Sequence, residues 1–283
     1  MQKLSFVTKE RIYRFSTNYR KMALFHFLSK YVDSQEIKQA FKYFDVRIDT
    51  RYMCEGKYAS VIPYKDETGK IRDVEVMIID PNTGFLLQDG DPRAMIQQTK
   101  RQNRNSDYFS CPSGNKCWSI ANELAKGYSL QRQDTLFGLD KVSEYGCNQI
   151  HMVSSADDAI KMKAIFPFTT WVAIGKKDLR LNADMGRVFR ERKVRLYRNI
   201  DDTDQRILKM EYALQKHGAN VEIDTYLCHW NSTRLYAFEF DFLDQSEEPE
   251  TMSISTIALN FLKSGSSRDM IASMLQIEQC IPF

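Results

Sequence analysis

The chain has 283 residues, of which 43% are hydrophobic and 27% are charged. These values are ordinary for a folded globular protein and exclude a fibrous or wholly disordered chain. The 40 Lys and Arg residues nearly balance the 37 Asp and Glu residues, so the net charge is only +3 and composition alone identifies no nucleic-acid partner. No apolar run reaches the roughly 20 residues of a membrane-spanning helix, and the first residues lack a secretory signal, so we expect a cytoplasmic protein.

The first part of the chain is expected to be α+β. Apolar residues at helical spacing over residues 22–31 predict a core helix, and a second helix is expected from Asp33, the first acid of a capping pair, to about residue 44. Two apolar segments flank the turn-forming residues 65–70 and predict a β-hairpin. Apolar spacing from Trp118 to Ala125 predicts a short helix.

A polar stretch over residues 97–109 contains Lys100, Arg101 and Arg104. Lysine and arginine bind phosphates with release of counterions, so this stretch is a candidate nucleic-acid interface. Lys176 and Lys177, which follow a predicted strand, are candidates for the same interface. A solvated loop with incidental charges remains the alternative.

Six cysteines are scattered at uneven spacing, and a chain of this length needs no disulfides, so we expect reduced thiols. Only Cys111 and Cys117 flank a short turn that contains Pro and Gly. A closed zinc site requires four ligands, and no second Cys or His pair stands at ligand spacing. A plain turn is therefore expected, with metal binding at this pair as the open alternative.

From residue 148 the pattern changes to alternating strands and helices. Strands are expected at residues 150–153, 169–175, 194–197 and 221–223, with helices at 155–165 and 202–217. Such alternation predicts a mainly parallel sheet with right-handed crossovers. In sheets of this kind, sites form in the loops beyond the carboxyl ends of the strands.

An acidic stretch with proline at residues 244–250 reads as a linker, and a small helical tail follows. Residues 261–277 resemble the opening of a transposase-type helix-turn-helix. Pro282 disfavours a recognition helix after Ile277, so we expect a helical pair that packs on the body.

The order of these elements resembles the core of bacterial primases, in which a hairpin-bearing subdomain precedes a Toprim domain. More specifically, residues 25–227 resemble Toprim-like proteins of unassigned function carried by Bacteroidetes genomes and mobile elements. Matching pieces lie at residues 25–28, 69–72, 80–84, 136–139 and 171–175. The resemblance implies an α/β fold: an α+β primase-like subdomain over residues 1–130, a Toprim-like, mainly parallel α/β domain over 131–244, and a linker with a helical tail over 245–283.

In active Toprim domains a Glu follows the first strand and an Asp-x-Asp pair follows the third, and these carboxylates hold Mg²⁺. The resemblance places Ser154 at the Glu position and Asn199 at the first Asp position. Only the second Asp, Asp201, is kept. The neutral amide of Asn199 binds a hard cation more weakly than a carboxylate does, so the resemblance implies a degenerate catalytic site.

Asp202 and Asp204 crowd the same turn as Asp201. Acids before a helix cap its free amides and complement its dipole, which is the expected role of all three; a weak Mg²⁺ site is the alternative, and no other cofactor is implied. Asp157 and Asp158 receive the same interpretation.

Three functions remain open at this point. The first is a non-catalytic accessory of DNA replication, repair or mobile-element transfer that binds nucleic acid or a replication protein. The second is a Mg²⁺-dependent primase, nickase or nuclease that uses Asp201, Asp202 and Asp204. The third is a protein-interaction module or an inhibitor of a host factor.

Overall fold

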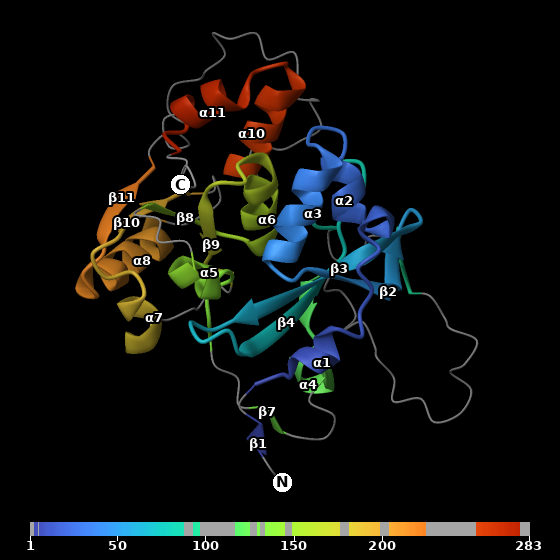
Figure 1. The fold of residues 1–283 in the computed structure, drawn as a ribbon, viewed down its shortest axis with the longest axis horizontal. Coiled ribbons are helices and arrows are strands. Elements are labelled where there is room, and N and C mark those ends of the chain that lie inside the picture. The colour runs from blue at the N-terminus through green and yellow to red at the C-terminus, as the bar shows by residue number, and fades with distance from the viewer. Residues whose placement is uncertain are drawn as a thin grey trace. The chain divides into compact units, whose positions relative to one another are not determined.

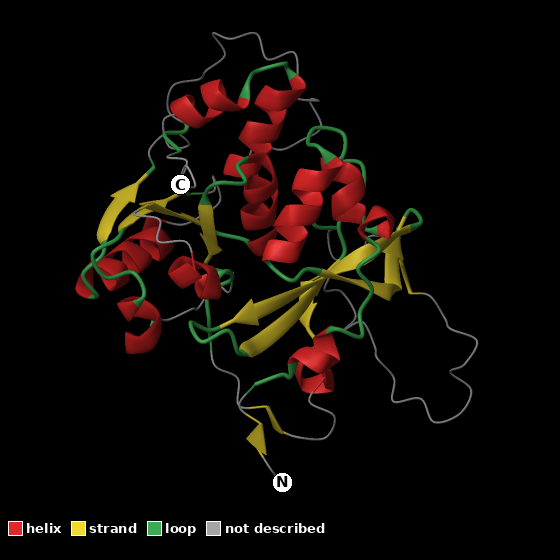
Figure 2. Ribbon diagram, viewed as in Figure 1, coloured by secondary structure: helices red, strands yellow, loops and turns green. Residues whose placement is uncertain are grey.

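The computed structural model describes residues 3–4, 6–87, 93–96, 117–124, 129–130, 134–144, 149–175, 181–198, 204–224 and 253–277. The chain divides into two compact units, which are Met1–Lys65 with Lys70–Asp134 (the first unit) and Asp66–Gly69 with Thr135–Phe283 (the second unit). Figure 1 labels the elements, and Figure 2 separates helices from strands. The first unit holds an antiparallel sheet and the second a parallel sheet, which confirms the expected α/β fold class.

The first unit is built on a five-stranded sheet with the order β5-β2-β3-β4-β6. Its strands are β2 (Arg47–Cys54), β3 (Lys57–Lys65), β4 (Ile71–Met77), β5 (Ala94–Ile96) and β6 (Cys117–Ser119). β3 and β4 form the expected hairpin, and Gly69 in its turn has a φ of +76°, which glycine adopts without steric cost. β2 was not expected, because its polar residues interrupt the apolar alternation.

The helix expected from Trp118 to Ala125 is wrong at its start. Residues Cys117–Ser119 form β6, in which Trp118 pairs with Val76 of β4, and the helix α4 covers only Ala121–Leu124. An unpaired strand edge offers backbone donors and acceptors to any segment that reaches it. A local apolar pattern cannot anticipate this pairing.

Short helices accompany this sheet. They are α1 (Lys9–Ile12), the 3-10 helix η1 (Tyr19–Lys21), α2 (Ala23–Leu28) and α3 (Ser34–Tyr43), and a two-residue strand β1 (Lys3–Leu4) pairs with β7 (Ser129–Leu130). Asp33 caps α3, because its carboxylate accepts a hydrogen bond from the Gln35 amide at 2.7 Å. The capping that the sequence predicts is therefore present.

The second unit is built on four parallel strands with the order β11-β10-β8-β9. The strands are β8 (Gln149–Val153), β9 (Thr170–Ala173), β10 (Lys193–Leu196) and β11 (Asn220–Ile223), and the helices are α5 (Leu139–Glu144), α6 (Ala156–Ile165), α7 (Ala183–Arg187) and α8 (Asp204–Lys216). Every residue of β8 and β9 is buried, as expected for parallel strands covered on both faces, although β9 is last in the strand order.

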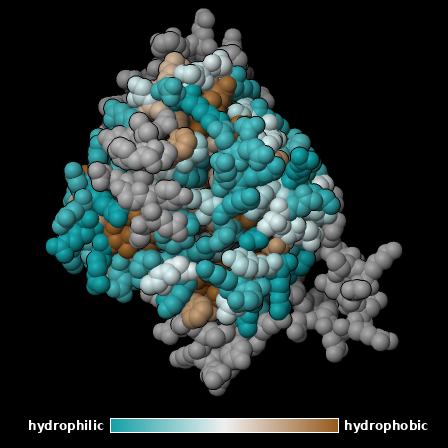
Figure 3. Space-filling view, in the orientation of Figure 1, coloured by the Kyte–Doolittle hydropathy of each residue, from teal (hydrophilic) through white to brown (hydrophobic). Residues whose placement is uncertain are grey.

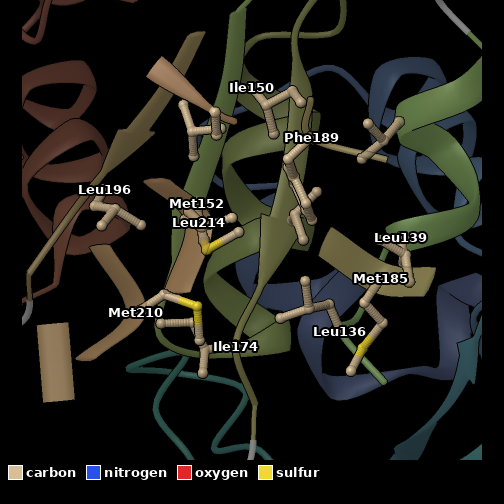
Figure 4. Close-up of a cluster of buried hydrophobic side chains, with 14 residues drawn as sticks. Leu136, Leu139, Ile150, Met152, Ile174, Met185, Phe189, Leu196, Met210 and Leu214 are labelled. Carbon is tan, nitrogen blue, oxygen red and sulfur yellow. The ribbon is translucent and has the colours of Figure 1, made fainter. Parts of the chain in front are cut away.

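One face of this sheet packs a hydrophobic core (Figure 4). Ile150 and Met152 of β8 and Leu196 of β10 contribute to it, together with Phe189 and Leu214. Each such side chain stabilises the fold by about 1.5–3 kcal/mol when it is fully buried. Because side chains alternate along a strand, this core fixes the register and turns His151, Trp171 and Arg195 to the opposite face.

The chain closes with a small helical tail, as expected, formed by α10 (Ile254–Lys263) and α11 (Arg268–Met274). α10 packs against α6 within the second unit. On the face that Figure 3 shows, described residues are mostly hydrophilic, and hydrophobic ones appear in small patches. Among the described residues there is no helix whose length and apolar character would let it cross a membrane.

Candidate functional site at the carboxyl edge of the parallel sheet

Ser154 and Gly175 lie side by side where β8 and β9 end. The Gly175 amide donates to the Ser154 carbonyl oxygen at 2.9 Å, and the Ile174 amide donates to the Val153 carbonyl at the same distance. Ser154 is buried, and Gly175 has a φ of +71°, in the left-handed region that favours glycine. The edge that the sequence predicts as a site is therefore formed, in its described part, by a buried serine and a tight glycine turn.

The chain that leaves β10 reaches the same edge. The Tyr197 amide donates to the Met152 carbonyl at 2.9 Å, and the Asp224 amide donates to the Leu196 carbonyl at 2.7 Å. Of the predicted acids beyond β10, Asn199, Asp201 and Asp202 lie outside the described residues. Asp204 is the first residue of α8, and the position of its side chain is likewise outside them.

Two acids that the sequence assigns to helix capping, Asp157 and Asp158, form an ion pair and hydrogen bonds within the second unit. The Lys161 ammonium pairs with the Asp157 carboxylate at 3.0 Å, one helical turn along α6, and the exposed fractions of these two side chains are 4% and 17%. A buried ion pair of this kind stabilises only as a pair, because removal of one partner leaves an uncompensated charge.

The carboxylate of Asp158 accepts hydrogen bonds from three serine hydroxyls. Ser155, the N-cap of α6, donates to Oδ2 at 2.6 Å, while Ser253 and Ser255 donate to Oδ1 at 2.6 and 2.5 Å. Ser253 is also the N-cap of α10. Ser155 is therefore the cap of α6, because its hydroxyl accepts from the Asp158 amide. The Asp158 carboxylate instead fastens the tail helix to α6, which the sequence did not indicate.

The pKa values of Asp157 and Asp158 are shifted in opposite directions. Burial, together with the neighbouring Asp157, raises the pKa of Asp158. Burial opposes ionisation of Asp157 as well, but the Lys161 ammonium outweighs it and lowers the pKa of Asp157. The pKa of Lys161 is raised because the two carboxylates outweigh its burial.

A layer of aromatic and polar side chains lies on the face of the sheet opposite the hydrophobic core. The rings of His151 and Trp171 stack at 4.7 Å between centroids, and His151 Nδ1 lies 2.9 Å from the Tyr197 hydroxyl. Tyr197 is almost fully buried, and burial raises its pKa. This layer is an aromatic platform inside the fold.

Arg195 and Asp224 complete that layer and were missed at the level of sequence. The Arg195 guanidinium contacts the Asp224 carboxylate at 2.8 Å and the Glu222 carboxylate at 3.1 Å. Asp224 is 1% exposed, and its Oδ2 has no hydrogen-bond partner within the described part of the chain. Because Asp224 follows β11 directly, the expectation that sites form beyond the carboxyl ends of the strands would have pointed to it.

The predicted basic residues lie outside the described part: Lys100, Arg101, Arg104, Lys176 and Lys177. Cys111 lies outside it as well, whereas the Cys117 thiol in β6 lies 3.7 Å from a carboxylate oxygen of Glu75. Among the described residues, no three His, Cys, Asp or Glu side chains gather as a metal site would require. Of the predicted site residues, the structure places Ser154 at the sheet edge, where it meets Gly175.

Comparison with known proteins gives a family and a set of similar structures. Residues 22–200 match the family described as "Domain of unknown function (DUF6371)", whereas none of the curated proteins matches the chain. Three similar solved structures are primases. The zinc-binding and RNA polymerase domains of the Aquifex aeolicus primase have 15% sequence identity and a TM-score of 0.42, and the match covers 88% of this chain and 53% of that one. The DnaG catalytic domain bound to ssDNA has 10% identity and a TM-score of 0.44, with 96% of this chain and 80% of that one covered, and the RNA polymerase domain of Mycobacterium tuberculosis DnaG with a double-stranded DNA oligomer has 10% identity and a TM-score of 0.40, with 94% and 84% covered. The chain spans about half of the Aquifex structure. These likenesses assign no activity to this chain.

Proposed function

This chain belongs to the DUF6371 family, and from that starting point we propose that it is a non-catalytic, Toprim-like accessory of DNA replication, repair or mobile-element transfer, which binds nucleic acid or a replication protein. The supporting observation is the state of the two acids that follow Ser154 most closely in the sequence. Asp157 is paired with Lys161, and Asp158 is bonded by three serines. A Mg²⁺ centre needs carboxylates that can turn toward the ion, and these two are committed to packing.

The residue at the Glu position adds to this support. Ser154 ends β8 in a buried position, and a serine hydroxyl neither carries a negative charge nor accepts a proton near neutral pH. In the proposed correspondence Asn199 replaces the first Asp, so two formal charges are lost from the site. The scaffold is kept while the groups that would hold a metal are replaced.

For nucleic-acid binding we propose phosphate contacts from Lys100, Arg101 and Arg104, with Lys176 and Lys177. Lys176 follows Gly175 directly in the sequence, and Gly175 closes the sheet edge beside Ser154. Cations that precede or follow such an edge neutralise backbone phosphates without reading the base sequence. The resulting affinity should be modest and strongly dependent on salt.

A Mg²⁺-dependent primase, nickase or nuclease is the second candidate. β10 runs parallel to β8 and next to it, so the chain leaves β10 at the edge where Ser154 lies. Asp201 and Asp202 come next in the sequence, between β10 and α8, and Asp204 is the first residue of α8. This order favours a rearranged acidic site over the third candidate, a protein-interaction module.

The binding proposal is tested by fluorescence anisotropy with single-stranded and duplex DNA over a range of salt concentrations. The triple variant Lys100→Ala, Arg101→Ala, Arg104→Ala should lower the slope of log affinity against log salt by about one for each lost contact. A matched control replaces three exposed lysines of the second unit by alanine: Lys209, Lys216 and Lys263. Absence of binding to either DNA would leave the protein-interaction module.

The non-catalytic part is tested by assays for priming and nicking with Mg²⁺ and Mn²⁺. We expect no turnover by the unaltered protein. Robust primer synthesis or cleavage that Asp201→Ala abolishes would establish the second candidate and overturn the first.

A further inference from the structure

A pocket of about 480 Å³ lies in the first unit, lined by residues of η1, α3 and the start of β2 and of the segments beside them. This volume is in the range of sites for small molecules. Its lining is unusual in composition, because four of its side chains are cationic: Arg20, Lys38, Lys42 and Arg47. Cations gathered in a concave site raise the local positive potential and attract anions.

The single carboxylate of the pocket does not cancel these charges. Asp45 pairs with the ammonium of Lys65, whose side chain is only 7% exposed, so a buried cation already compensates the charge of Asp45. Within the described part of the chain, Arg20, Lys38 and Lys42 form no ion pair with any carboxylate. The pocket therefore keeps several positive charges that the fold itself does not use.

Arg47 is held in place but incompletely paired. Its guanidinium lies 4.7 Å above the centre of the Tyr13 ring, and the nearest carboxylate oxygen, on Asp45, is 4.0 Å away. Its Nε is buried and has no hydrogen-bond partner among the residues that the structure describes. A guanidinium fixed on an aromatic ring with donors to spare is suited to a ligand with several acceptor oxygens.

The pocket is built before any ligand arrives. The Ile48 amide donates to the Ser16 carbonyl at 2.9 Å, which ties the segment before η1 to β2. The Tyr19 ring meets Phe41 of α3 edge-on at 5.2 Å. Lys38 and Lys42 are one helical turn apart on α3 and therefore share a face. A preformed arrangement of donors lowers the cost of ordering on binding.

We propose that this pocket binds phosphate groups, carried either by a free nucleotide or by a nucleic-acid chain. Arg47 and Arg20 supply planar forks of donors, and Lys38 and Lys42 supply point charges. Thr17 and Asn18, which also line the pocket, add a neutral hydroxyl and an amide. The site needs no property of the parallel sheet, so it extends the proposed function if the phosphates belong to nucleic acid and is independent of it if they belong to a nucleotide.

The test is calorimetric titration at low salt with three probes: inorganic tripolyphosphate, ATP and an oligothymidylate. The double variant Lys38→Ala, Lys42→Ala should weaken binding roughly tenfold or more for each phosphate contact that it removes. Lys209→Ala, Lys216→Ala is the matched control, because both lysines are exposed on a helix of the second unit. Arg47→Lys keeps the charge but removes the fork, and it should also weaken binding.

The probes separate the two sources of phosphate. ATP binding that depends on Lys38 and Lys42, without such dependence for the oligonucleotide, assigns a free nucleotide; the reverse result assigns a nucleic-acid chain. The proposal is overturned if no probe binds the unaltered protein, or if the double variant leaves the affinity of every bound probe unchanged. DNA binding that responds to Lys100, Arg101 and Arg104 but not to Lys38 and Lys42 would overturn this inference and leave the proposed function standing.

Discussion

The helices α3 and α6 each have ten residues and each carry two or more basic side chains, yet the two helices use them differently. α6 is buried on all sides, and its Lys161 and Lys163 end on groups of the protein itself. α3 buries only Ile37, Ala40 and Phe41, and its Lys38 and Lys42 line a pocket.

The difference is that the lysines of α6 bond groups of the protein, whereas those of α3 line a pocket. In the second unit, Lys161 pairs with Asp157 and Lys163 bonds a backbone carbonyl inside the fold, so these two lysines are tied to the folded structure. In the first unit, Lys38 and Lys42 line a pocket and pair with no carboxylate among the described residues, so they contribute little to folding. Substitutions on α6 should therefore change stability, whereas those on α3 should change binding.

The largest effect is expected from Lys161→Ala. The change leaves the buried carboxylate of Asp157 beside Asp158 without a counter-charge, which should cost about 3–5 kcal/mol in the free energy of unfolding. Urea denaturation measures it. In the double variant Asp157→Asn, Lys161→Ala the loss should be smaller than in Lys161→Ala alone, and a purely additive result would show that the pair is not coupled.

A smaller loss is expected from Ser255→Ala, which removes a fully buried hydroxyl that donates to Asp158. Loss of a hydrogen bond to a charged acceptor should cost about 1–3 kcal/mol. Ser264→Ala is the control, because its exposed hydroxyl bonds neighbouring groups of the same tail, the Phe261 carbonyl and the Ser266 hydroxyl. Equal denaturation midpoints for the two variants would contradict the role of Asp158 in fastening α10.

Because the pKa of Lys163 is lowered, we expect the free energy of unfolding to rise with pH. Burial, and to a lesser extent the charge of Lys141, lowers the pKa of Lys163 from 10.5 to about 8. Between these values the unfolded chain holds a proton that the folded protein has released, so the free energy of unfolding increases as pH rises. Denaturation at about pH 7 and about pH 9 measures this, and Lys163→Met should remove its share of the increase. An unchanged pH dependence in that variant would contradict the lowered pKa.

The smallest effect on stability is expected from Lys38→Ala, Lys42→Ala, which should change the free energy of unfolding by less than about 0.5 kcal/mol. Thermal denaturation of this variant beside the unaltered protein measures it. A loss above this value would mean that these lysines support α3 itself, and the contrast between the two helices would fail.

The sequence predicts the parallel sheet well, because buried apolar runs such as residues 150–153 are bounded by turn-forming and capping residues that mark their ends. The pattern also predicts which strand ends form one edge, because the carboxyl ends of parallel strands lie together. The choice of Ser154 at that edge came from the resemblance to Toprim domains.

The sequence could not predict contacts between distant segments. Ser253 and Ser255 lie 95 and 97 residues from the aspartate that they bond, and the local pattern indicates only a helix cap. The pocket proposed to bind phosphate could not be predicted for the same reason, because Arg20 and Arg47 are brought together by the bridge between Ser16 and Ile48. Asp224 is different, since its place directly after a strand was visible in the sequence.

The central claim is our proposal that Ser154 and Asn199 replace two metal-binding carboxylates at the sheet edge, and calorimetric titration with Mn²⁺ tests it most directly. The unaltered protein should show no site that depends on Asp201, and the variant Ser154→Glu, Asn199→Asp should bind Mn²⁺ measurably more tightly, because two anionic ligands are restored. Tight Mn²⁺ binding by the unaltered protein that Asp201→Ala abolishes would contradict the claim.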